Sequence, residues 1–145
     1  MKAPVQKLTS TEELGRLRDR LRATRDNGRP RITICGGTGC RANGSLELAA
    51  ALKAELDQHR LDATVELKLC GCHGFCQQGP VVVVEPLDIF YRRVGLEDRQ
   101  RDARDIIEET IIAGRPVERL LYEDERTGEK IVHYGEIPFY TKQMR

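Results

Sequence analysis

Residues 31–40 read Arg-Ile-Thr-Ile-Cys-Gly-Gly-Thr-Gly-Cys, a run of alternating β-branched residues followed by a glycine-rich turn between two cysteines. The alternation predicts a β-strand that ends at Cys35. Glycine lacks a β-carbon and permits tight turns, so Cys40 can follow closely behind this strand. The stretch therefore predicts a strand that carries a pair of thiols at its far end.

A second strand with its own cysteines is predicted downstream. Apolar residues recur at helical spacing in residues 45–59, which predicts a helix capped by Asn43 or Ser45. Residues 63–69 alternate as a strand does and end at the second cysteine group. Two strands joined by a helix form a right-handed parallel crossover, so both cysteine groups are expected at the carboxyl ends of adjacent strands, where open α/β sheets place their sites.

The remaining pattern predicts the fold class. Residues 81–84 and 89–94 form a predicted antiparallel hairpin, and residues 97–113 form a predicted helix. The order of elements suits an α/β thioredoxin-like fold, with a mixed sheet of about four strands and flanking helices.

Two extensions flank this predicted domain, which we place at residues 30–115. A helix start signal, Thr9-Ser-Thr-Glu-Glu13, precedes leucines at helical spacing and predicts a helix over 11–25, within an N-terminal segment of residues 1–29. After Pro116 the pattern thins to short apolar pieces around a charged turn. Residues 116–145 are therefore predicted to be a connecting arm.

The composition excludes several classes of function. The chain has 24 Lys and Arg residues against 23 Asp and Glu residues, a net charge of +1, which argues against a dedicated nucleic-acid binder. The longest apolar run, Val81–Val84, falls far short of the ~20 residues of a membrane-spanning helix, and the first residues lack the apolar stretch of a signal peptide. We expect a soluble, cytoplasmic protein that does not insert into membranes.

The five cysteines are clustered, and in a reducing compartment such clusters hold a metal or a redox centre more often than disulfides. The pairs Cys35-x4-Cys40 and Cys72-x3-Cys76 are looser than the Cys-x2-Cys knuckles of structural zinc sites and suit a wider, two-iron object. Neither the bacterial nor the plant-type ferredoxin spacing is present.

The residues between the cysteines fit an anionic iron-sulfur cluster, which needs hydrogen-bond donors close to its sulfurs. Glycines let backbone amides approach and let the chain take positive φ angles. Phe75 is expected to shield one side from water, and His73 is the one histidine expected to act as a donor near the ligands. Further polar neighbours are expected from Thr38 and Arg41, and the glycines in question are Gly36, Gly37, Gly39, Gly71 and Gly74.

Three other readings of the cysteines stay open at this point. They could be buried small hydrophobes, a structural zinc site, or a dithiol redox centre, although the Cys-x2-Cys of a thioredoxin is absent. Cys70 is the odd one out; we expect it to pack beneath the site, with an exchange of roles with Cys72 as the alternative.

The motifs Cys35-Gly-Gly-Thr-Gly-Cys40 and Gly71-Cys-His-Gly-Phe-Cys76, followed by Gly79-Pro-Val-Val-Val-Val-Glu-Pro86 and Ile89-Phe-Tyr91, resemble the thioredoxin-like 2Fe-2S ferredoxin domain. This domain begins many NADH-binding β subunits (diaphorases) of NAD(P)-linked hydrogenases and formate dehydrogenases, which are similar to the NADH-binding subunit of respiratory complex I. The resemblance covers about residues 30–122.

The resemblance implies that Cys35, Cys40, Cys72 and Cys76 hold one 2Fe-2S cluster and that the chain passes single electrons within an NAD(P)H-linked oxidoreductase. It also implies redox partners, namely a flavin/NAD-binding domain and iron-sulfur subunits, and the free-standing ferredoxins of this fold can form homodimers. Residues 115–122 and 137–143 look like the linker that leads into the flavin domain.

No Gly-x-Gly-x-x-Gly stretch follows a strand in this sequence, so neither flavin nor nicotinamide has an evident binding site. We expect no independent catalysis. His59 and His133 lie in polar surroundings and are read as surface residues.

Overall fold

The computed structural model describes residues 7–25 and 28–143, and its centre is a mixed four-stranded sheet. The parallel pair of strands and the antiparallel hairpin predicted above are both present, so the predicted sheet is confirmed. The strands lie in the order β2-β1-β3-β4, with bounds β1 (Arg31–Cys35), β2 (Glu66–Cys70), β3 (Val82–Glu85) and β4 (Ile89–Tyr91).

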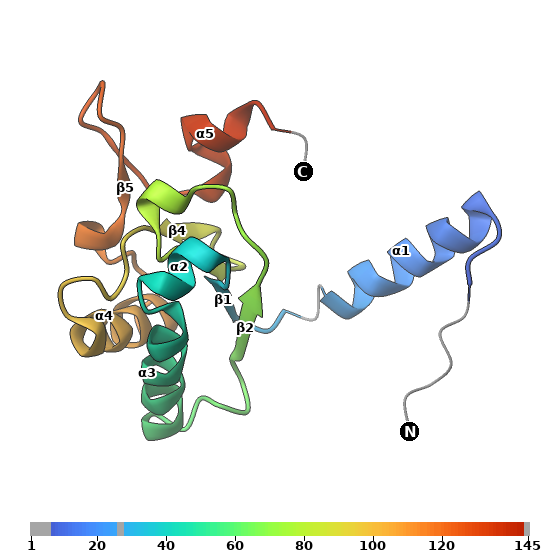
Figure 1. Ribbon diagram of the computed structural model, residues 1–145. Helices are drawn as coiled ribbons and strands as arrows, with labels where there is room; N and C mark the ends of the chain where they lie inside the picture. The colour runs from blue at the N-terminus through green and yellow to red at the C-terminus, as the bar shows by residue number, and fades with distance from the viewer. Residues whose placement is uncertain (1–6, 26–27, 144–145) are drawn as a thin grey trace.

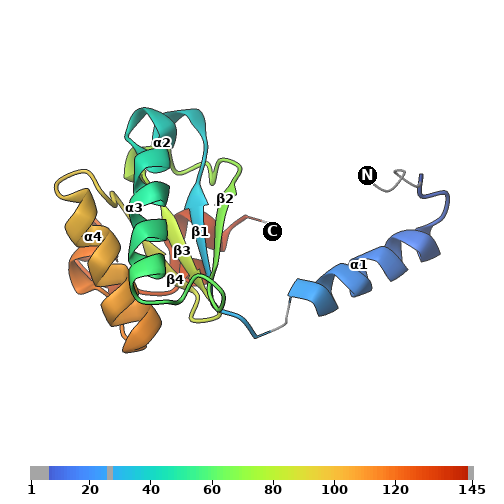
Figure 2. The same ribbon diagram turned by 90° about the horizontal axis from the view of Figure 1, so that it is seen from below.

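One face of the sheet is covered by helices. These are α3 (Ser45–Gln58) and α4 (Arg99–Asp105), the latter continuing into a π-helical segment, η2 (Ile106–Ile112) (Figures 1 and 2). The alternate residues Ile32 and Ile34 of β1 point to this face and are fully buried with the helix residues. Each such side chain contributes about 1.5–3 kcal/mol by leaving water, so this core fixes the sheet against α3.

The opposite face is covered in part by the C-terminal residues. Cys35, Val83 and Phe90 point to this side and pack with Ile137 and Tyr140, which are 0% and 1% exposed. The described part of the predicted arm therefore packs on the sheet. Its elements are η3 (Glu118–Leu120), a hairpin of β5 (Tyr122–Glu123) and β6 (Lys130–Ile131), η4 (Tyr134–Glu136) and α5 (Pro138–Thr141).

The N-terminal helix α1 (Thr11–Arg25) has the predicted bounds and extends away from the sheet and its helices in both views (Figures 1 and 2). Its start is a capping box: the Glu13 amide donates to Ser10 Oγ over 3.2 Å, and the Glu13 carboxylate accepts from the Thr9 amide over 2.7 Å. In the part of the chain that the structure describes, no helix has the length and apolar character needed to cross a membrane.

Three local expectations differ from the structure. The glycine-rich turn holds a short helix, α2 (Thr38–Ala42), which begins after Gly37. Neither Asn43 nor Ser45 caps α3; Gly44, at a φ of 86°, occupies the cap position because the chain reverses there in the left-handed region. Strand β2 starts at Glu66 rather than at residue 63, since the preceding residues form a turn that hydrogen-bonds back to the Leu61 carbonyl.

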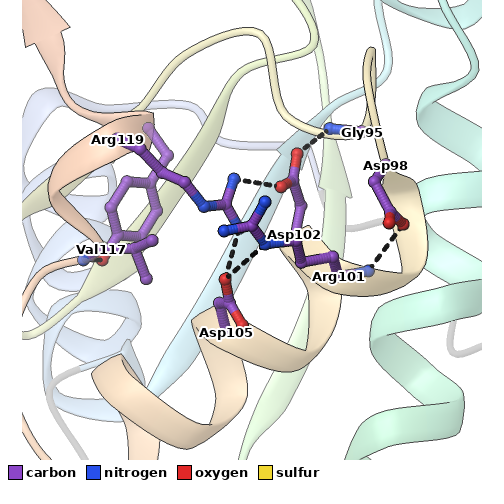
Figure 3. A network of polar contacts seen from close by, with 8 residues as sticks. Gly95, Asp98, Arg101, Asp102, Asp105, Val117 and Arg119 are labelled. Carbon is purple, nitrogen blue, oxygen red and sulfur yellow. Dashed lines mark hydrogen bonds and ion pairs between the residues drawn. The ribbon is translucent and has the colours of Figure 1, made fainter.

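A buried carboxylate ties the C-terminal residues to α4. Asp102 is 3% exposed and accepts hydrogen bonds from the Gly95 amide, at 2.7 Å, and from the Arg119 guanidinium (Figure 3). Arg119 also pairs with Asp105, and both contacts raise the pKa of Arg119, against the effect of its partial burial. The guanidinium therefore offsets the charge that Asp102 carries into the interior.

Replacing Arg119 by Ala should leave the Asp102 carboxylate buried with the Gly95 amide as its remaining partner. Removing one member of a buried pair costs about 3 kcal/mol, which corresponds to a fall of roughly 10 °C in the apparent unfolding midpoint of a chain of this size. Thermal unfolding followed by circular dichroism measures the change. The control is Arg104→Ala, an exposed change on α4, the helix that contains Asp102; equal midpoints for the two variants would contradict the assignment.

Candidate metal centre

The fold brings the two cysteine groups together at one end of the sheet. Cys35 is the last residue of β1 and pairs in register with Cys70, the last residue of β2. The turn after β1 and the loop after β2 are joined by a hydrogen bond from the Gly36 amide to the Cys70 carbonyl, at 3.0 Å. The predicted parallel crossover thus places both groups at the carboxyl ends of adjacent strands.

Four thiols form one connected set. The sulfurs of Cys72 and Cys76 lie 3.7 Å apart. The Cys35 thiol lies close enough to Cys40 to raise the pKa of that thiol, and close enough to Cys72 to lower the pKa of that one. The structure therefore brings together the four residues that the sequence predicted as ligands.

The four thiols differ in their exposure to solvent. Cys35 and Cys40 are 1% and 2% exposed, whereas Cys72 and Cys76 lie on the surface. A group held by all four would contact the interior through the first pair and the solvent side through the second. An electron could leave such a group on the side of Cys72 and Cys76.

Several glycines around the thiols leave space that a β-carbon would fill. A β-carbon on Gly37 would lie 2.9 Å from Cys72 Cβ, and one on Gly79 would lie 2.6 Å from Cys40 Sγ. Among the glycines expected to need positive φ angles, Gly74 alone has one, at 79°. Gly36 and Gly37 instead allow the chain to pass close to Cys70 and Cys72, where a β-carbon would not fit. Gly79 was not identified from the sequence, although its position three residues after Cys76 was a usable signal.

A backbone amide points at one of the exposed sulfurs. The Gly74 amide donates to Cys72 Sγ over 3.3 Å, and the Val81 backbone lowers the pKa of the Cys40 thiol, against the effect of burial. Such donors stabilise negative charge on a ligand sulfur. The expectation of close amides in the glycine-rich loops is met at Gly74.

The thiols shift one another's pKa. Burial and the contact with Cys35 raise the pKa of Cys40 to about 12. The Gly74 amide and the Cys76 thiol lower the pKa of Cys72, and Cys72 in turn raises the pKa of Cys76. Four thiolates at this site would repel one another, so a cationic metal core is needed to hold them all in the ionised form.

Cys70 and His73 form a separate contact beside the four thiols. The Cys70 sulfur lies 3.2 Å from His73 Nε2 and also contacts the Ile34 and Gly71 carbonyls. His73 Nδ1 lies 3.2 Å from the Tyr134 hydroxyl. His73 therefore bridges Cys70 and the C-terminal residues, and Cys70 lies at the sheet end beside the predicted ligands.

Phe75, between the two exposed cysteines, is covered by aromatic rings. Phe139 stacks on it with ring centres 4.3 Å apart and an interplanar angle of 8°. Tyr122 and Tyr140 contact it at 5.6 Å and 5.8 Å. The sequence predicted a shielding role for Phe75 but not its partners, because no local pattern links residues so far apart.

The other polar residues considered above lie around or away from this centre. Thr38 and Arg41 are exposed on α2. His59, at the end of α3, lies 3.9 Å from Glu55 and 3.8 Å from Glu108, and His133 is exposed beside β4. Neither of these two histidines is part of the thiol set.

The donor set fits a two-iron cluster. Within residues 7–25 and 28–143, no group of three or more His, Cys, Asp or Glu side chains is arranged to hold one metal ion. Four sulfur donors, an amide donor at Gly74 and glycines that leave room beside the sulfurs together fit a 2Fe-2S cluster.

Comparison with known proteins agrees with this chemistry. The family described as thioredoxin-like 2Fe-2S ferredoxin matches residues 22–109. A 2Fe-2S ferredoxin from Clostridium pasteurianum is 35% identical over 104 residues, covering 65% of this chain and 96% of that protein. A 2Fe-2S ferredoxin from Aquifex aeolicus strain VF5 is 34% identical over 83 residues, covering 57% of this chain and 71% of that protein.

The fold comparison gives the same result. The crystal structure of the wild-type thioredoxin-like 2Fe-2S ferredoxin from Aquifex aeolicus matches with a TM-score of 0.56 at 30% identity, over 66% of this chain and 98% of that one. The predicted thioredoxin-like fold is thereby confirmed, and residues 110–145 lie beyond the stretch that the family description matches.

Proposed function

Because the chain belongs to the family of thioredoxin-like 2Fe-2S ferredoxins, it carries a 2Fe-2S cluster and transfers electrons, and we propose that four cysteines hold the cluster. The four are Cys35, Cys40, Cys72 and Cys76. The observation that carries the proposal is their connected set of thiols, with glycines that leave room beside Cys40 and Cys72.

The chain's own residues would have different roles at this site. When bound, the cluster takes up and releases one electron at a time. Cys35 and Cys40 fix one side within the packed interior, and the Gly74 amide places a dipole toward Cys72. Cys72 and Cys76, on the surface, bring the opposite side within reach of a partner protein.

We further infer that the partner belongs to an NAD(P)H-linked oxidoreductase of the hydrogenase, formate dehydrogenase or complex I type. The support is the resemblance of the cysteine motifs, the Gly79–Pro86 stretch and the C-terminal residues to diaphorase β subunits. In such an assembly a flavin domain takes hydride from NAD(P)H and hands single electrons to this chain.

This inference predicts that NADH alone does not reduce the protein, whereas NADH with a flavoprotein does. NADH alone should leave the visible absorption of the protein unchanged, because the sequence has no dinucleotide-binding fingerprint. NADH together with the flavin-containing diaphorase subunit of a hydrogenase should bleach this visible absorption on the time scale of the diaphorase's turnover. Reduction by NADH alone would contradict the division of labour, and no reduction with the flavoprotein would contradict membership in this class.

A thiol-disulfide activity is the second candidate, favoured by the 3.7 Å between the exposed sulfurs of Cys72 and Cys76. It predicts reduction of insulin disulfides by metal-free protein. No activity of the metal-free protein in that assay would exclude this candidate.

A further inference from the structure

The C-terminal arm contacts the loop that contains Cys72 and Cys76 at several points, three of which lie next to Gly74. Tyr134 Oη lies 3.2 Å from His73 Nδ1, and the Tyr140 hydroxyl donates to the His73 carbonyl over 3.5 Å. Phe139 stacks on Phe75. Both residues that flank Gly74 are therefore held from α5 and η4.

The peptide group between His73 and Gly74 connects these contacts to a predicted ligand. Its carbonyl accepts the hydrogen bond from Tyr140, and its N–H, on Gly74, donates to Cys72 Sγ over 3.3 Å. A peptide group is planar, with its C=O and N–H pointing in opposite directions. Holding the carbonyl toward Tyr140 therefore aims the amide at the sulfur.

The same geometry strengthens the donor. A hydrogen bond to a carbonyl polarises the peptide group and makes its N–H a better donor, because linked hydrogen bonds reinforce one another. The Tyr140 ring is 1% exposed, packed between Phe90 and Tyr134, so its hydroxyl is held in place.

We propose that Tyr140 is a positioning residue for the cluster, acting through the His73–Gly74 peptide on the Cys72 sulfur. The proposal rests on the ligand set given above. An amide donor stabilises the more negative, reduced form, so Tyr140 raises the reduction potential. Tyr140 lies in the C-terminal arm, outside residues 22–109, the stretch that matches the family.

Tyr140→Phe tests this directly, because it removes the hydroxyl and keeps the ring. We expect the midpoint potential to fall, with a two- to fivefold change in the equilibrium constant for reduction. A tenfold change in a one-electron couple equals about 59 mV, so spectroelectrochemistry resolves the effect. The electron paramagnetic resonance spectrum of the reduced protein should shift as well, since a ligand sulfur loses part of a hydrogen bond.

The matched control is Tyr122→Phe. The Tyr122 ring also lies against Phe75, but among the described residues its hydroxyl makes no hydrogen bond. Iron and sulfide are measured in every variant. If the parent protein holds no cluster, the ligand proposal fails; if both variants hold a full cluster at the parent potential, the role of Tyr140 is refuted; if Tyr122→Phe shifts as much as Tyr140→Phe, the effect belongs to ring packing and the peptide route is refuted.

Discussion

Replacing Cys72 by Ala is expected to abolish cluster retention, lowering bound iron from about two atoms per chain to almost none. Cys72 lies on the surface, so a ligand missing there would leave one side of the cluster open to water. Iron and acid-labile sulfide, measured after anaerobic purification, report the loss. Cys76→Ala should behave in the same way.

The control for this prediction is Cys70→Ala in the same loop. Cys70 contacts His73 and two carbonyls, and it is outside the proposed set of ligands. Its replacement should leave the cluster in place. If the cluster is kept in Cys72→Ala and lost in Cys70→Ala, then Cys70 is the ligand in place of Cys72.

Gly79→Ala is the second change with a large expected effect. A β-carbon at this position would lie 2.6 Å from Cys40 Sγ and 3.3 Å from the Cys76 carbonyl, well inside the usual contact distance of about 3.5–4.0 Å. Cys40 is 2% exposed and packed on all sides, so its sulfur cannot yield without moving the chain around it. We expect loss of most of the bound iron, measured with the folded state by circular dichroism.

Alanine substitutions at two other glycines should lower the iron content less than Gly79→Ala. Gly71→Ala meets no atom within 4 Å and should retain iron as the parent does. Gly37→Ala should fall between, since its β-carbon would approach Cys72, at 2.9 Å from Cβ, and Cys72 is exposed and freer to shift. Equal iron content in Gly79→Ala and Gly71→Ala would show that the crowding at Cys40 is not a constraint.

The sheet and its crossover were predictable because their signals are local. The alternation in residues 31–35 and the helical spacing in residues 45–59 each arise within a single element that buries one side in the core. The meeting of the cysteine groups then follows because adjacent parallel strands end at the same edge of the sheet. The register of Cys35 with Cys70 agrees with that prediction.

The features that sequence reasoning missed depend on contacts between distant residues. Phe139 and Tyr140 lie more than 60 positions from Phe75 and His73, so no window of the sequence contains both partners. The arm resembles a linker in composition because its buried apolar residues form two short groups, around Leu121 and around Ile137, with a charged stretch between them. The small helix α2 was missed for another reason: it contains Gly39 and follows Gly36 and Gly37, and such glycines favour a turn when the sequence is considered without tertiary contacts.

The most direct test of the central claim is electron paramagnetic resonance of the anaerobically purified, dithionite-reduced protein. A 2Fe-2S cluster held by Cys35, Cys40, Cys72 and Cys76 predicts one S = ½ signal that integrates to about one spin per chain, and the signal should be absent from the Cys76→Ala variant. A protein that contains one zinc ion per chain and gives no signal, or one whose signal persists without Cys76, would contradict the account.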